Sequence, residues 1–120
     1  ENRADLLSER FLQFGADIIK LIKMLDTNQM YRHIGMQLFR SATSIGANYE
    51  EARGAESRQD FSHKMQVVLK EARESLFWLK LINKSEIIKI EIISNLIDEN
   101  QQICDIIAKS VKTLKNKNNK

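Results

Sequence analysis

Acidic and histidine side chains at helical spacing could hold metal ions in this sequence. Four-helix bundles bind pairs of metal ions through carboxylates and Glu-x-x-His motifs, in which the two ligands lie one helical turn apart. The one similar spacing is Asp60 to His63, and His33 has no acidic residue three positions before it. We therefore expect no metal site and no cofactor. Four other acids are explained more simply as surface charges or ion-pair partners: Glu50, Glu51, Glu71 and Glu74.

Nucleophilic catalysis would need a serine or cysteine beside a histidine and an orienting group. Cys104, the only cysteine, lies on an apolar stripe and is expected to be a buried small hydrophobic residue. Four scattered glycines do not form a phosphate-binding loop. The sequence therefore predicts that the protein is not an enzyme. A single cysteine also fits a reducing compartment, so we expect a cytoplasmic location.

The basic residues gather near the carboxyl end. The formal charge of the chain is +3, and the segment Lys112–Lys120 carries four lysines and no acids, so the remainder has a charge of −1. Such a segment indicates either a nucleic-acid contact or a solvated helix end whose lysines interact favourably with the helix dipole. We expect residues 116–120 to form a disordered basic tail.

Apolar residues recur at steps of three and four in four segments, which predicts four amphipathic helices. With no proline in 120 residues, the fold class is all-α. Ser57 and Asp60 form a capping-box-like start before Phe61. Asn100 interrupts the last apolar seam and is expected to fix helix register. The predicted domain is an up-down-up-down antiparallel bundle over residues 1–115, with helices at about 4–26, 29–54, 58–83 and 90–115.

The second and third helices carry more surface than a monomeric bundle needs. A polar band follows one side of the second helix: Gln37, Arg40, Ser44, Asn48 and Glu51. The segment Leu76–Ile82 is apolar nearly all round, and an exposed patch of this kind marks an interface. We therefore predict a homo-oligomer that uses Gly35, Phe39, Gly46, Phe77, Trp78 and Leu81. The alternative is a wider intramolecular core in which the fourth helix covers this face.

The stretch QLFRSATSIGANYEEARGAESRQDF, from Gln37 to Phe61, followed by LKEARESLFWLKLI, resembles the 23S rRNA intervening-sequence (S23-like) protein family. The family pattern is approximately Q-[IL]-R-R-[SA]-[SA]-x-S-I-x-x-N-I-A-E-G, then S-x-x-[DE]-F. This sequence has Phe39 where the pattern has its first arginine. The same fold family is similar to the accessory variability protein of diversity-generating retroelements.

The resemblance implies a cyclic homopentamer of bundles without catalytic activity, and a role in binding RNA or a ribonucleoprotein or reverse-transcriptase partner. Two functions follow as hypotheses. In the first, basic residues from several subunits add up to an RNA-binding surface; they are Arg40, Arg53, Arg58, Lys64, Lys112, Lys115 and Lys117. In the second, the oligomer is a scaffold that binds another protein, and the lysines serve solubility.

Overall fold

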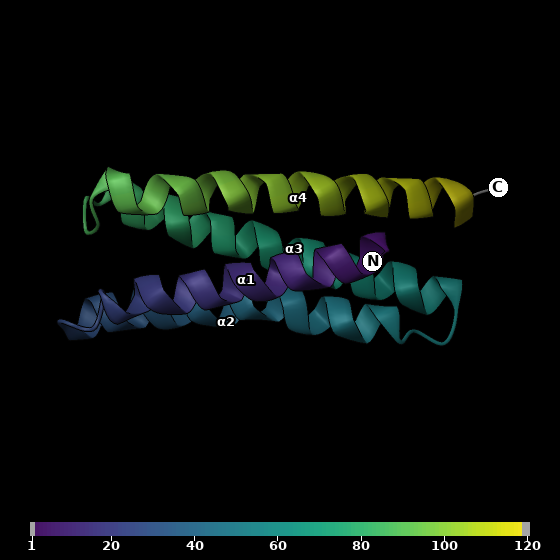
Figure 1. The fold of residues 1–120 in the computed structure, drawn as a ribbon, viewed down its shortest axis with the longest axis horizontal. Helices are drawn as coiled ribbons and strands as arrows, with labels where there is room; N and C mark the ends of the chain where they lie inside the picture. The colour runs from purple at the N-terminus through teal and green to yellow at the C-terminus, as the bar shows by residue number, and fades with distance from the viewer. Residues whose placement is uncertain (1, 119–120) are drawn as a thin grey trace.

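The computed structural model describes residues 2–118, which form four α-helices joined by short connections (Figure 1). The helices are α1 (Arg3–Lys23), α2 (Gln29–Arg53), α3 (Arg58–Lys84) and α4 (Ile90–Asn118). Each helix runs opposite to the one before it and packs against it, giving a rod of 50 × 26 × 24 Å. The predicted all-α up-down four-helix fold is confirmed.

Polar caps fix where three helices begin. The Asn28 side chain accepts a hydrogen bond from the backbone N–H of Tyr31 at 2.9 Å. Ser57 accepts one from the N–H of Asp60 at 3.0 Å, and the Asp60 carboxylate accepts one from the N–H of Glu56 at 3.2 Å. Asn2 caps α1 in the same way. These bonds satisfy amide groups that have no partner inside the helix, so the predicted start at residue 58 is confirmed.

The end of α4 differs from the prediction. The helix continues to Asn118, so residues 116–118, which were expected to be disordered, are helical. Lysine is a good helix former, and Lys115 and Lys117 lie in the last turn, where the helix dipole favours positive charge. The other two residues of the predicted tail, 119 and 120, lie outside the described residues.

The apolar stripes of all four helices meet in one core. Fully buried side chains include Phe11, Phe14 and Ile18 of α1, Leu38 and Ile45 of α2, Val68 and Leu79 of α3, and Ile103 and Ile107 of α4. Contact is most extensive between α2 and α3 and least between α1 and α4. There the guanidinium of Arg10 donates to both carboxylate oxygens of Glu99, at 2.8 and 2.7 Å, and to Gln102 at 2.9 Å.

Two glycines of the predicted oligomer interface lie where α2 packs against α1 within one chain. A Cβ atom at Gly46 would be 3.5 Å from Cβ of Phe11 and 3.7 Å from its backbone. A Cβ at Gly35 would be 3.5 Å from side-chain atoms of Ile22 and Leu25. The small size of these two glycines therefore accommodates α1. The close helix approach that their size predicts occurs within the chain.

Asn100 forms the buried polar contact between α3 and α4. Its side chain is fully buried, its Oδ1 accepts a hydrogen bond from Ser75, and its Nδ2 donates to the carbonyl oxygen of Ala72 at 2.9 Å. Because these polar atoms would otherwise be buried without partners, a shift of α4 along α3 would be costly. The predicted place of Asn100 in the seam is confirmed, and its role in fixing register stays a prediction.

We expect Asn100→Ala to lower the free energy of unfolding by about 1–3 kcal/mol, since it removes these hydrogen bonds and leaves a cavity. Urea denaturation measures the change. Asn95→Ala is the matched control, because Asn95 is exposed on the same helix; it should change stability by no more than about 0.5 kcal/mol. Equal losses in the two variants would contradict a structural role for the buried contact.

Candidate nucleic-acid interface

The antiparallel order brings basic residues from four helix ends to one end of the bundle. The start of α1, the connection between α2 and α3, and the end of α4 all lie on the same side in Figure 1. This basic end contains six of the seven predicted nucleic-acid-binding residues and two others, Arg3 and Lys109: Arg3, Arg53, Arg58, Lys64, Lys109, Lys112, Lys115 and Lys117. Residues far apart in the sequence are thus brought together.

Two of the predicted cations at the basic end already have partners. Arg53 donates to the Asp5 carboxylate and to the Ser8 hydroxyl, each at 2.8 Å, and the bond to Asp5 raises the pKa of Arg53. Lys64 pairs with Asp60 at 3.2 Å, one turn away on α3. Exposed pairs of this kind contribute little to stability, so a phosphate group could compete for either cation.

A polar groove of about 290 Å³ lies between α1, α3 and α4 at the basic end. Arg3 and Lys109 lie along it with the hydroxyl-bearing residues Ser110 and Thr113, and Phe61 contributes an aromatic side chain. Cations beside hydroxyl groups are suitable donors for phosphate oxygens. The sequence analysis missed Arg3 and Lys109. The spacing of Lys109 to Lys112, three residues on a helix, could have indicated that Lys109 belongs with the others.

Arg40 lies apart from the basic end, in the middle of the α2–α3 contact. Its guanidinium is 3.1 Å from a carboxylate oxygen of Glu71 and also bonds Glu74, which accepts a second bond from the indole N–H of Trp78 at 3.1 Å. Glu71 is largely buried. Two carboxylates thus hold Arg40 in place, away from the basic end.

The rest of the polar band bonds mainly to its own helix. The Ser44 hydroxyl donates to the carbonyl of Arg40 at 2.6 Å, and the Asn48 amide donates to the carbonyl of Ser44 at 2.8 Å. Gln37 is half-buried and Glu51 is exposed. Within the band, the described hydrogen bonds to a neighbouring helix are those of Arg40.

The aromatic residues predicted to lie at an oligomer interface are on the surface of one copy. The exposed fraction is 56% for Phe77 and 36% for Phe39. Trp78 and Leu81 are half-buried, and Trp78 packs edge-to-face with Phe77.

The described residues contain no arrangement suited to metal binding. No group of three or more His, Cys, Asp or Glu side chains within residues 2–118 could hold a metal ion. Cys104 is buried, and burial raises the pKa of its thiol, which disfavours the reactive thiolate. None of the helices in this part of the chain is both long and apolar enough to cross a membrane.

These features describe a small antiparallel four-helix bundle with one basic end. The family model described as 23S rRNA-intervening sequence protein matches residues 7–109. The chain belongs to this family, which confirms the resemblance found in the stretch Gln37–Phe61.

A solved structure has the same fold. It is a protein with unknown function from the S23 ribosomal protein family of Bacteroides thetaiotaomicron, and it superimposes with a TM-score of 0.81. The two sequences are 35% identical, and the match covers 88% of this chain and 97% of that one. None of the curated proteins compared with this chain matches it.

The ion pair between Arg40 and Glu74 makes a testable contribution to stability. The hydrogen bond from Arg40, followed by that from Trp78, lowers the pKa of Glu74. A lowered pKa in the folded state stabilises the protein above the ordinary pKa of a glutamate, and this stabilisation is lost as the pH falls through the lowered value. Arg40→Gln should therefore raise the pKa of Glu74 and weaken the pH dependence of stability in the acidic range.

The pKa of Glu74 can be followed by NMR titration of its side-chain carboxyl group. Arg32→Gln removes the same charge far from Glu74, where Arg32 pairs with Asp26, and should leave the pKa of Glu74 unchanged. An unchanged pKa in Arg40→Gln would mean that the pair does not form in solution.

Proposed function

We propose that this protein is a non-catalytic, self-associating bundle that binds structured RNA through its basic end. The observation that carries the proposal is the convergence of cations at this end, including the groove lined by Arg3 and Lys109. α4 has no acidic residue after Asp105, so its last turns present lysines alone among charged side chains. Phosphate contacts by such side chains supply most of the sequence-independent affinity for nucleic acids.

Self-association would strengthen this interaction. One copy offers a few cations over a small area, whereas a cyclic oligomer repeats the basic end around its axis. The family resemblance implies five copies. Since Phe39 and Phe77 are exposed on a single copy, the described surface supports such assembly. We expect the protein to work in the cytoplasm, where Cys104 stays reduced.

The binding surface can be tested with a labelled RNA hairpin titrated at two salt concentrations. In the basic-end variant, Lys109, Lys112 and Lys115 are replaced by glutamine. We expect its affinity at low salt to fall at least about tenfold and the slope of log K against log salt to decrease by roughly 2, because up to three phosphate contacts are lost.

The matched control replaces three exposed lysines at the opposite end of the bundle, Lys23, Lys84 and Lys89, by glutamine. It changes the net charge equally and should bind RNA as the unmodified protein does. Equal weakening of both variants would show that total charge, rather than the basic end, determines binding. If the unmodified protein does not bind RNA at low salt, the proposal fails in favour of the scaffold that binds a protein partner, such as a reverse transcriptase.

A further inference from the structure

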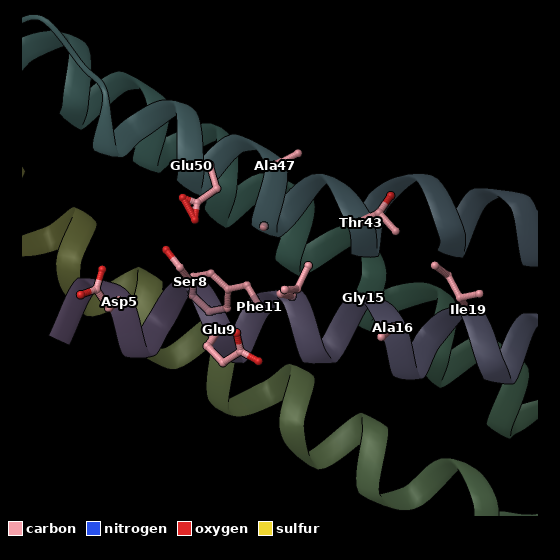
Figure 2. A pocket seen from close by; sticks show the side chains of 12 residues that line it. Asp5, Ser8, Glu9, Phe11, Gly15, Ala16, Ile19, Thr43, Ala47 and Glu50 are labelled. Carbon is pink, nitrogen blue, oxygen red and sulfur yellow. The ribbon is translucent and has the colours of Figure 1, made fainter. Parts of the chain in front are cut away.

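An apolar groove follows the outer face of α1 and α2, opposite to the sides that face the core (Figure 2). It consists of two hollows, of about 560 and 380 Å³, that share Ile19. We call them together the α1–α2 groove. Gly15, Ala16 and Ala47 keep it open because their side chains are small or absent. The lining is predominantly apolar in both hollows.

The spacing of the lining residues is that of a helix-binding surface. On α1 they follow at steps of three and four: Glu9, Leu12, Ala16, Ile19 and Lys23. On α2 the same steps recur: Met36, Phe39, Thr43, Gly46 and Glu50. Two neighbouring rows of side chains with this repeat form a surface for a third helix. The side chains of that helix pack between those of the two rows.

Large apolar side chains along the groove have no cover in the single chain. The exposed fraction is 67% for Leu12, 56% for Met36 and 40% for Ile19. Residues of this size, repeated on one face of a helix, mark a surface that another helix covers. The occupant should present bulky apolar groups on a helix with cationic residues nearby, because carboxylates lie at one end of the groove.

The chain itself carries such a helix face. On α3, Phe77, Trp78 and Leu81 form a ridge beside the core stripe: Phe77 is exposed, Trp78 and Leu81 are half-buried, and the Phe77 and Trp78 rings lie 5.0 Å apart. We call these three residues the aromatic ridge. Lys70 and Arg73 are exposed on the same helix, one to two turns before Phe77.

The ridge and the groove lie at the same height along the bundle. Glu74 of α3 bonds Arg40 of α2, which aligns the two antiparallel helices. Phe77 is one turn beyond Glu74 and is therefore level with residues roughly three positions before Arg40. Met36 and Phe39 line the groove there. In a ring whose axis is parallel to the bundles, every copy has the same height, so the ridge of one copy can meet the groove of the next.

The charges also match in this arrangement. Glu9 and Glu50 lie on opposite sides of the groove near the start of α1 (Figure 2). Lys70 and Arg73 precede the ridge on α3, and α1 and α3 run in the same direction. When the ridge of one copy meets the groove of the next, the two cations therefore lie on the side of the two carboxylates, which favours this pairing.

We propose that the aromatic ridge of one copy docks in the α1–α2 groove of the next. This inference rests on the proposed self-association and specifies how the copies join. The two surfaces differ, so each copy uses its ridge on one neighbour and its groove on the other. Such head-to-tail contacts close into a ring where the rotation between neighbours allows it, whereas identical surfaces would pair two copies and stop.

The test uses one variant that blocks each surface. Ala16→Glu places a long charged side chain in the groove, and Phe77→Glu places a charge on the ridge. Both positions are exposed in the single chain, so both variants should fold, which circular dichroism verifies. Met30→Glu is the control, because Met30 is 65% exposed and belongs to neither surface.

Light scattering after size-exclusion chromatography gives the mass of each protein. We expect the unmodified protein and Met30→Glu to be oligomers, and Ala16→Glu and Phe77→Glu to be monomers of 13.9 kDa. Mixing the two monomeric variants in equal amounts should give a dimer of twice this mass, because one retains an intact ridge and the other an intact groove. Neither can extend further.

Several outcomes would overturn the inference. If either variant remains an oligomer like the unmodified protein, the two surfaces do not meet. The same conclusion follows if the mixture stays monomeric. A monomeric unmodified protein would also remove the proposed self-association. RNA binding is measured in a separate titration, so that part of the proposed function can succeed or fail on its own.

Discussion

The close approach of α1 to α2 is the constraint on which this helix pair depends. It shapes both the buried contact between the two helices and the α1–α2 groove on their outer face. Because Gly35 and Gly46 have no Cβ, side chains of α1 reach the body of α2, and Phe11 is fully buried where the two helices meet. Next to this contact, Gly15 and Ala16 leave the outer face hollow. The same scarcity of side-chain volume that brings the helices together thus creates the apolar groove, so packing inside the chain and the surface offered to a partner have one cause.

The basic end depends on a different kind of contact. Arg3 can lie beside Lys109 only if α1 stays next to α4, where packing is least extensive. The pair between Arg10 and Glu99 crosses this seam with two hydrogen bonds, a geometry that specifies orientation more than it stabilises. Asn100 restricts the position of α4 along α3 in turn. Polar contacts therefore set where the cations lie, while the apolar core provides most of the stability.

The four helices could be predicted from the sequence because each needs only a local signal. Apolar steps of three and four and the cap at Ser57 are readable without knowing any neighbour. Contacts between residues of different helices cannot be predicted from such local signals. The sequence showed that Gly46 permits a close approach, but not that Phe11 of the same chain makes it. Likewise, the sequence allows Arg40 either to pair with an acid or to contact RNA, and only the fold brings it to Glu71 and Glu74 of another helix. Arg3 was missed because nothing local relates it to the end of α4.

The geometry of assembly bears directly on the proposed RNA binding, because one chain has a formal charge of only +3. A head-to-tail ring with its axis along the bundles keeps every copy pointing the same way, so all basic ends lie on one face. In a dimer joined by identical surfaces, a two-fold axis perpendicular to the bundles would turn the second copy over. The two basic ends would then be separated. Since affinity for phosphate grows with the number of cations that contact one nucleic acid, the first arrangement concentrates charge and the second disperses it. The ridge and the α1–α2 groove have no cations in common with the polar groove at the basic end, so in the proposed assembly they would affect RNA binding only through the orientation of the copies.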